Sequence, residues 1–257
     1  MPADKNTTRT KERALPAIAL LTILAVWAAV VHWFEIPEYI VPSPIHVART
    51  FVRDFSVIMR NLWPTALESF LGFAFGNIAS IAIATVFVHS KTVEQAFFPL
   101  AIIVRSIPIV AIAPILVLML GNDMTPKVLI AALICFFPTL VNMVKGLSSV
   151  NPQALELMKV LSASKSEIFF KLRLYNSLPY LFAALKIAAS ASVIGAIVGE
   201  WIGSTEGIGA LIIQATYNFD TGLLYAAITA ACIFSVLFTV LITWLERRVV
   251  KWSPEIG

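Results

Sequence analysis

Three charged side chains, Arg105, Lys186 and Glu200, lie inside or at the edge of long apolar runs in this chain of 257 residues. An ionisable group inside a bilayer is costly, so such a residue is a candidate for a functional site or a salt bridge. We expect Lys186, two turns from the end of its run, to snorkel to the membrane surface. For Arg105 and Glu200 the sequence leaves two roles open: structural pairing or anchoring, and contact with a passing solute.

The other residues that commonly do chemistry form no enzyme or metal pattern. Cys135 and Cys232 both fall in apolar runs, and the three histidines are scattered along the chain. We interpret the cysteines as small buried side chains rather than a disulfide or a metal pair. The chain has no GxxxxGK[ST] phosphate-binding loop and no Ser/His/Asp or Cys/His set. We therefore predict that this chain has no catalytic residue, binds no metal or cofactor, and cannot hydrolyse ATP itself.

The elements that must position the charged residues are membrane helices. Hydrophobic residues make up 59% of the chain and charged residues only 13%, which is low for a soluble domain. Apolar runs of about 20 residues, long enough to cross a bilayer as helices, recur along the sequence. We predict an all-α, polytopic helical membrane protein, with residues 1–257 forming one transmembrane domain in contact with lipid. The basic residues flank the spans, so no nucleic-acid partner is expected.

Six spans are predicted, and the positions of lysine and arginine orient them. The spans cover residues 14–34, 64–88, 96–119, 127–146, 179–200 and 222–245. One side of the membrane would hold 13 Lys and Arg residues and the other side four. Cytoplasmic segments carry the excess of positive charge, so we predict that the loop 147–178 and the tails 1–13 and 246–257 are cytoplasmic. We interpret the first apolar run as a retained span rather than a signal peptide.

Residues 35–63 form a predicted external segment that contains an amphipathic helix. Apolar residues recur at helical spacing in it, at Val47, Phe51, Phe55, Ile58 and Leu62. This pattern indicates a helix lying at the outer membrane interface. The sequence leaves open whether the helix packs on the bundle or meets a partner.

Two of the predicted spans carry small residues at every fourth position. In the second span these are Gly72, Gly76, Ser80 and Ala84, and in the fifth they are Ala184, Ala188, Ser192 and Ala196. Such stripes let helices approach closely in lipid. For the second span we favour packing within the chain. For the fifth span, packing, a dimer seam and the lining of a pathway remain open.

Three prolines, Pro99, Pro108 and Pro114, weaken the third span. A broken helix is tolerated at membrane depth where the freed carbonyls face protein or a water-filled cavity. The third span is therefore either a kinked helix or a candidate pathway helix. The full set of candidate pathway residues is Arg105, Pro108, Asn142, Ser192, Glu200 and Trp201.

Residues 151–179, the longest charged interruption of the apolar pattern, predict two short helices joined by a turn. Asn151 and Pro152 begin the first helix, with the proline at a tolerated first position. The run Ser162–Ser164 ends this helix, and its last residue begins the second as part of a capping box with Glu167. A compact polar knob between two spans indicates a docking point for a soluble partner.

The pattern of this loop resembles the docking loop of binding-protein-dependent ABC permeases. In that motif EAA is followed by three residues, a glycine, nine residues, an isoleucine, two residues and LP. Glu156–Met158 occupies the EAA positions, and Ser162 stands in place of the glycine. Leu174–Tyr175 stands in place of LP, with Pro179 as the later proline.

Further segments extend the resemblance over most of residues 37–250, to permeases of the nitrate/sulfonate/taurine type. They are VPSP at 41–44, RSIPIVAIAPI at 105–115, FFPTLVNMVKG at 136–146, LPYLFAALKIAASASVIGAIVGEWIGS at 178–204 and GIGALI at 207–212. Within that type, VGEW at 198–201 looks more like permeases grouped with thiamine-precursor, pyrimidine or riboflavin uptake. Phe70 departs from the pattern, because many relatives place arginine there.

The resemblance implies the fold and role of a type I ABC importer permease in a bacterial inner membrane. Two permease copies, expected to be identical, would form the translocation pathway. A cytoplasmic ABC ATPase dimer would bind their loops together with ATP and Mg, and a periplasmic or lipid-anchored binding protein would deliver solute. The residues expected to meet the ATPase are Glu156, Leu157, Leu161, Ser162, Ala163 and Ser164.

The resemblance also limits the choice of solute and of rival functions. We expect a small organic molecule such as a pyrimidine or vitamin precursor, with nitrate, sulfonate or taurine as the alternative. An ATP-independent secondary transporter or channel is the rival from another class, but it would not need the loop and often shows inverted repeats, which this sequence lacks. A scaffold subunit of a membrane complex is a second rival.

Overall fold

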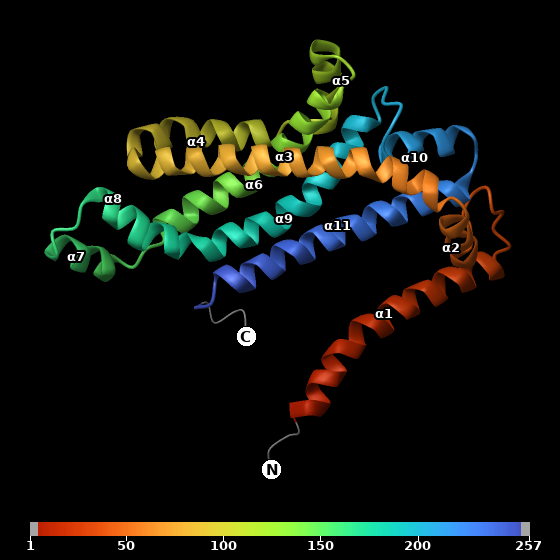
Figure 1. The fold of residues 1–257 in the computed structure, drawn as a ribbon, viewed down its shortest axis with the longest axis horizontal. Helices are drawn as coiled ribbons and strands as arrows, with labels where there is room; N and C mark the ends of the chain where they lie inside the picture. The colour runs from red at the N-terminus through yellow and green to blue at the C-terminus, as the bar shows by residue number, and fades with distance from the viewer. Residues whose placement is uncertain (1–4, 253–257) are drawn as a thin grey trace. The chain divides into compact units, whose positions relative to one another are not determined.

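The computed structural model describes residues 5–252, with side chains described from residue 15 onward. In this described part every regular element is helical (Figure 1). The helices are α1 Lys5–Trp33, α2 Pro44–Arg53, α3 Phe55–His89, α4 Lys91–Arg105, α5 Ile109–Leu120, α6 Met124–Ser148, α7 Pro152–Val160, α8 Lys165–Ile168, α9 Leu174–Glu200, α10 Ile208–Tyr217 and α11 Thr221–Val249. A π-helical turn, Phe169–Arg173, joins α8 to α9. The all-α prediction is confirmed, and the ends of the predicted tails, 1–4 and 253–257, lie outside the described residues.

Five helices of the described part are long and apolar enough to cross a membrane, and the bent pair α4 and α5 makes a sixth span if counted as one. The five correspond to the predicted first, second, fourth, fifth and sixth spans. The third span is broken rather than kinked, because α4 and α5 meet at 94°. The break lies at Ser106–Pro108, where the proline lacks an N–H and restricts the residue before it.

The segment before the second span is divided differently from the prediction. Helix α2 ends at Arg53 and α3 begins at Phe55, so the helix that contains the predicted second span begins nine residues before residue 64. Asp54 separates the two helices, and its carboxylate lies 2.7 Å from the Arg53 guanidinium. Pro64 lies inside α3 and does not end it. Helix α10 was not predicted at all.

The helices form two compact units, each described by itself. The first comprises residues 1–58 and 211–229. Within it, the rings of Trp27 and Tyr225 lie 5.9 Å apart and connect α1 to the start of α11. The Thr221 hydroxyl donates a hydrogen bond to the Glu38 carbonyl at 2.5 Å. Gly222 lies close against His46, so α2 also packs on the start of α11.

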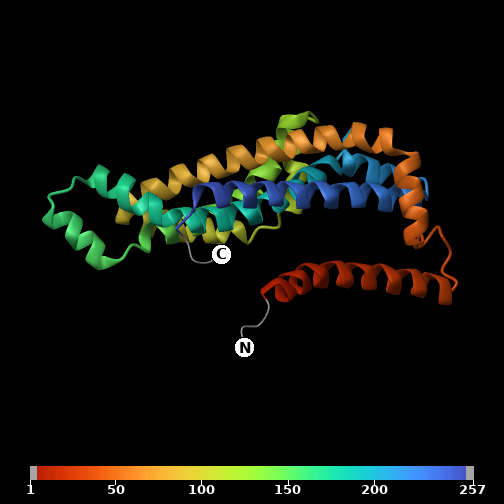
Figure 2. The same ribbon diagram turned by 60° about the horizontal axis from the view of Figure 1, so that its bottom comes forward.

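The second unit comprises residues 59–210 and 230–257 and is built around the antiparallel pair α6 and α9. Figures 1 and 2 both show these two helices side by side. A Cβ atom added at Gly195 would lie 2.7 Å from the Ala131 Cα, and one at Gly199 would lie 2.9 Å from the Lys127 Cα. The backbones of α6 and α9 therefore touch where these glycines lie.

Both stripes of small residues serve packing within this unit. On α3, Gly72 and Gly76 lie directly against Ala131 and Ala132 of α6, as predicted for the second span. The stripe of α9, Ala184, Ala188, Ser192 and Ala196, is fully buried. For the fifth span the structure thus favours packing within the chain over a dimer seam.

Helix α11 is held to α9 and α3 by an ion pair and an aromatic cluster. Lys186 of α9 lies 2.9 Å from the Glu246 carboxylate of α11, an ion pair that the sequence did not predict. Phe70, at the position where relatives carry arginine, packs its ring 4.4 Å from that of Phe238 and 5.8 Å from that of Phe234. An arginine there would place a charge in this apolar contact.

Candidate functional site

Two polar features lie at opposite ends of the α6/α9 pair. Helix α6 has 25 residues and therefore spans about 37 Å. The loop 149–173, with α7 and α8, follows its carboxyl end and leads into α9 (Figure 1). A cluster of buried charged groups surrounds its amino end and the carboxyl end of α9. The packed helices α6 and α9 therefore connect the loop to the cluster.

The loop begins with the predicted helix start. Asn151 is the N-cap of α7, and its side-chain oxygen accepts a hydrogen bond from the Gln153 N–H at 2.9 Å. Pro152 takes the first helical position, where its missing N–H costs nothing. The start of the first loop helix is therefore encoded locally.

The turn between the two loop helices has the hydrogen bonds of a Schellman motif. The Ala163 N–H donates to the Met158 carbonyl and the Ser162 N–H donates to the Lys159 carbonyl, both at 2.9 Å. Ser162 has a φ of +56°, which places it in the left-handed region. Glycine adopts this region without steric cost. Ser162 therefore takes a backbone conformation that glycine, the residue of the resembled motif at this position, would adopt without strain.

The second loop helix begins with the predicted capping box. The Ser164 hydroxyl accepts from the Glu167 N–H at 3.2 Å, and the Glu167 carboxylate accepts from the Ser164 N–H at 3.0 Å. Lys171 lies 2.9 Å from the same carboxylate. The caps on both sides of the turn fix its shape without help from the rest of the chain.

The base of the loop is anchored to the bundle. Phe169 is buried in an apolar cluster with Phe87 of α3 and Leu140 of α6. The Arg173 guanidinium donates to the Leu147 carbonyl at 2.9 Å, and the Asn176 amide donates to the Gly146 carbonyl at 3.1 Å. These bonds attach the π-helical turn and the start of α9 to the end of α6, so a force on the loop is transmitted to both helices.

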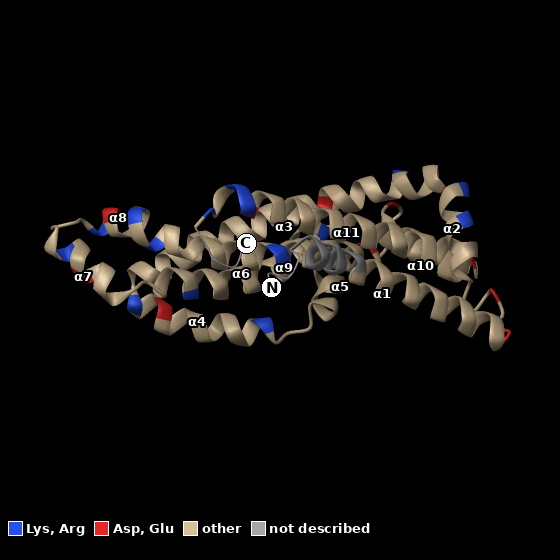
Figure 3. Cartoon of the chain, turned by 90° about the horizontal axis from the view of Figure 1, so that it is seen from below, with Lys and Arg blue, Asp and Glu red and all other residues tan. Residues whose placement is uncertain are grey.

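The tip of the loop exposes apolar side chains. Leu157, Val160 and Leu161 are 60%, 81% and 67% exposed. Figure 3 shows lysine, arginine and acidic residues on α7 and α8. Of the other predicted docking residues, Glu156, Ser162 and Ser164 are exposed and Ala163 is half-buried. Val160 was missed by the sequence reasoning, although it lies beside Leu161 in the same apolar run.

At the other end of the unit, the Glu200 carboxylate is buried and holds the start of α10. One oxygen accepts from the Thr65 hydroxyl at 2.5 Å and the other from the Gly209 N–H at 2.6 Å. The Thr65 oxygen in turn accepts from the Ile208 N–H at 2.8 Å, and the Asn61 side chain accepts from the Gly207 N–H at 3.1 Å. Three free N–H groups of a helix start are thus satisfied by α3 and α9.

Glu68 and Lys127 extend this cluster. The Lys127 ammonium lies 3.6 Å from one Glu68 oxygen and donates to the Ser204 hydroxyl at 2.8 Å. The second oxygen, Oε2, is buried without a hydrogen-bond partner among the described residues. The Glu68 carboxylate also interacts electrostatically with Glu200. The sequence analysis did not single out Glu68, although an acidic residue inside the predicted second span could have indicated a buried site. It counted Lys127 among the residues on the external side.

A polar pocket of about 210 Å³ opens beside these groups. Buried Glu68 and Lys127 contribute to its wall, whereas Asp123, Thr205 and Glu206 are exposed at its edge. The remaining lining residues are Pro64, Asn122, Met124 and Ser204. The Asn122 amide donates to the Gly203 carbonyl, which ties the two loops at the edge together.

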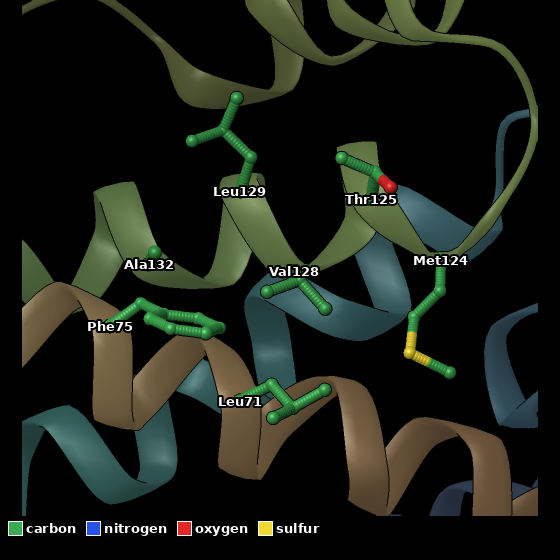
Figure 4. A pocket seen from close by; sticks show the side chains of 7 residues that line it. All are labelled: Leu71, Phe75, Met124, Thr125, Val128, Leu129 and Ala132. Carbon is green, nitrogen blue, oxygen red and sulfur yellow. The ribbon is translucent and has the colours of Figure 1, made fainter.

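A second, apolar pocket of about 390 Å³ lies between α3 and α6. Figure 4 shows its wall, formed by Leu71 and Phe75 of α3 and by Met124, Thr125, Val128, Leu129 and Ala132 of α6. Met124 lines both pockets.

The structure does not bring the predicted pathway residues together. Arg105 and Pro108 are exposed at the break between α4 and α5. Asn142 donates to the Pro138 carbonyl at 2.8 Å, and the fully buried Ser192 donates to the Ala189 carbonyl at 2.9 Å, both within their own helices. Trp201 is 45% exposed beside buried Glu200.

These features define a class of protein: a polytopic helical permease with a rigid, capped loop that presents apolar side chains between two spans. The chain belongs to the family described as the binding-protein-dependent transport system inner membrane component, which matches residues 76–251. It is therefore a permease subunit of an ABC importer, a transport component of the bacterial inner membrane with several membrane spans. This membership excludes the secondary transporter and the scaffold subunit.

Individual relatives agree with this assignment. The chain is 32% identical over 238 residues to a probable ABC transporter permease protein of Haemophilus influenzae, covering 93% of this chain and 97% of that protein. It is 32% identical over 241 residues to the formylaminopyrimidine transport permease protein ThiX of Halalkalibacterium halodurans, covering 93% and 96%. A solved structure of the MetNI methionine ABC transporter in an inward-facing conformation has a similar fold, with a TM-score of 0.67 at 17% identity over 77% of this chain and 98% of that chain.

The resemblance drawn from the sequence is confirmed. Relatives of the sulfonate and taurine type and relatives of the thiamine-precursor and riboflavin branch both match the chain. The type I importer fold agrees with the likeness to the MetNI permease.

Proposed function

We propose that two copies of this permease form the translocation pathway and that a cytoplasmic ABC ATPase dimer grips their loops. The ATPase, and not this chain, would bind ATP and Mg and hydrolyse ATP. A periplasmic or lipid-anchored binding protein would deliver the solute on the opposite side. In this arrangement both termini and the loop 149–173 face the cytoplasm, which agrees with the excess of lysine and arginine on that side.

The observation that carries the proposal is the exposed apolar tip of the loop. Leu157, Val160 and Leu161 are more than half exposed on a segment whose backbone is fixed by three caps. Apolar side chains on a preorganised knob favour binding to a partner's groove, because little conformational entropy is lost on docking. Glu156 and Ser164 beside them would provide polar contacts at the rim.

The loop base converts docking into movement of the spans. Because Phe169 and Arg173 connect the loop to α3 and α6 as well as to α9, a displacement of the knob moves these helices together. Packed helices shift as rigid bodies rather than deform. ATP-driven closure of the ATPase dimer would thus reach the polar cluster at the other end of α6 and α9. Arg105 and Pro108, at the break of the third span, are proposed pathway residues that face the second copy.

We infer that the solute is a small organic molecule such as a pyrimidine or vitamin precursor. The support is the 32% identity to a permease whose name states formylaminopyrimidine transport. Nitrate, sulfonate or taurine remains the alternative, supported by sulfonate and taurine transport permeases among the relatives at 25 to 26% identity.

Co-purification with a co-expressed cognate ABC ATPase tests docking. Leu161→Asp should reduce the amount of ATPase retained, and the transport-coupled ATP hydrolysis in lipid, by at least about tenfold, since a buried unpaired charge at an interface costs several kcal/mol. The control is Val52→Asp, which changes an apolar side chain, 76% exposed on α2, in the same way. Equal ATPase retention by both variants would contradict docking through the loop.

A further inference from the structure

An apolar groove lies between the three helices α3, α4 and α6. Its volume is about 470 Å³, and every described residue in its wall is apolar. Helix α4 contributes one stripe of side chains at helical spacing, which includes Val93, Phe97, Ala101 and Val104. The groove shares no lining residue with the polar pocket or with the pocket of Figure 4. It is therefore a separate feature of the second unit.

The chemistry of the groove requires an apolar occupant. Helix α4 has no buried residue in the described structure, although it is one half of a membrane span. An apolar wall offers water no hydrogen-bond partner, so water does not fill such a space. An unfilled groove would leave the side chains of its wall without dispersion contacts on one side. A polar solute would likewise find no group to bind here.

The dimensions of the groove distinguish a lipid chain from a protein helix. From Val93 to Val104 helix α4 rises about 16 Å, close to the thickness of about 15 Å of one leaflet of the hydrocarbon core. The volume divided by this length gives a cross-section of about 30 Å². A helix with its side chains is about 10 to 12 Å across and occupies about 100 Å². The groove is thus too narrow for a helix of a second copy but wide enough for one unbranched hydrocarbon chain.

The start of α4 indicates which leaflet supplies the chain. Lys91 opens this helix and its side chain is 80% exposed, with the Glu94 carboxylate 3.5 Å from its ammonium group. A lysine beside the first residue of the groove lies at the level of the lipid headgroups, where an anionic lipid attracts it. In the proposed orientation the connection between α3 and α4 is cytoplasmic, so the groove runs from that surface towards the centre of the bilayer.

We propose that one acyl chain of a phospholipid from the cytoplasmic leaflet occupies this groove and holds α4 against α3 and α6. Phe87 and Leu140 line the groove and also belong to the apolar cluster that buries Phe169 at the base of the docking loop. The acyl chain therefore packs on two side chains that anchor the loop. This inference goes beyond the proposed function, because it assigns a site for a lipid rather than for the solute or the ATPase.

The test uses the full chain without ATPase or solute, so failure of loop docking leaves it unaffected. The protein is purified in a detergent with a rigid sterol body, which cannot enter a narrow groove. The probes are palmitoyl-oleoyl phosphatidylglycerol and dibutanoyl phosphatidylglycerol, which has the same headgroup on short chains. Native mass spectrometry measures the lipid bound, and thermal unfolding measures stabilisation. The long-chain lipid should bind and raise the midpoint saturably, because a ligand of the folded state stabilises it, whereas the short-chain lipid should do neither.

Two variants of α4 connect lipid binding to the groove. Ala101→Phe places a ring in the groove and should weaken the apparent affinity of the first bound long-chain lipid at least about fivefold, since the ring replaces the contacts of the chain. Ala96→Phe makes the same change at an exposed position of the same helix outside the groove and should bind lipid like the unchanged protein. If Ala101→Phe fails to fold, Val104→Phe, which also enters the groove, replaces it.

Three outcomes would overturn the proposal. The first is equal lipid affinity in Ala101→Phe and Ala96→Phe, and the second is equal stabilisation by the short-chain lipid, which would indicate binding through the headgroup alone. The third is a loss of dimer, with lipid binding unchanged, in the native mass spectrum of Ala101→Phe. That result would show that the groove is an interface between two copies of this chain.

Discussion

Lys186 of α9 and Glu246 of α11 form an ion pair of 2.9 Å between two membrane helices, 60 residues apart in sequence. The Glu246 side chain is 9% exposed and that of Lys186 35% exposed. In a poorly solvated environment, either group alone would carry an uncompensated charge. The pair therefore fixes the register of α11 against α9.

Breaking this pair from one side should cost more than removing it entirely. Lys186→Met or Glu246→Gln alone should destabilise the protein by about 1 to 3 kcal/mol, because the remaining group loses its partner. The double variant should recover much of that loss. Thermal unfolding in detergent measures all three, and strictly additive losses would show that the two side chains do not interact.

The left-handed turn at Ser162 predicts a stabilising substitution. Ser162→Gly should stabilise the loop by about 1 kcal/mol, because serine is strained at positive φ whereas glycine is not. Hydrogen exchange of the Ala163 N–H, which closes the Schellman motif, should slow. Ser166→Gly in the first turn of α8 is the control and should not stabilise the loop, because Ser166 has no positive φ to relieve and glycine is a poorer helix former. Faster exchange in Ser162→Gly would exclude the strain argument.

The contact between α6 and α9 predicts a severe packing defect. Gly195→Val would drive its side chain into the Ala131 backbone, where even a Cβ atom would lie 2.7 Å from the Cα, and should cost about 1 to 3 kcal/mol or more. The same apolar enlargement at exposed Ala183 of α9 should change little. Thermal unfolding compares the two variants. A similar midpoint for both would mean that α6 and α9 are not in close contact.

The buried hydroxyl of Thr65 predicts local weakening at the start of α10. Thr65→Val removes the donor to Glu200 and the acceptor of the Ile208 N–H, so about 1 to 3 kcal/mol should be lost for each unsatisfied group. Hydrogen exchange at residues 207–210 should accelerate by at least tenfold. Ser192→Ala, which removes an equally buried hydroxyl that donates to the Ala189 carbonyl and makes no contact with residues 207–210 in the described structure, should leave this segment protected. Unchanged exchange in Thr65→Val would contradict the anchoring role.

Local signals in the sequence predicted most of the helices and the loop. Long apolar runs identify spans whatever their partners, because a helix satisfies its own backbone in lipid. Asn151, Pro152 and Ser164 act within one or two turns of the chain, so the two loop helices could be derived without a fold. The same local signals do not decide the backbone at Pro108, where the sequence left a kinked helix open and the structure has a bend of 94° between α4 and α5.

Sequence alone therefore determined the membrane class, the spans and the capped loop, since hydropathy and capping are properties of neighbouring residues. Only the tertiary structure decided that Glu68, Lys127 and Glu200 share one cluster and that Lys186 pairs with Glu246. The partners in these contacts are separated by about 60 residues or more, and no periodicity links them. Buried charges are positioned by the helices that enclose them, so their roles appear only once α3, α6, α9 and α11 are packed.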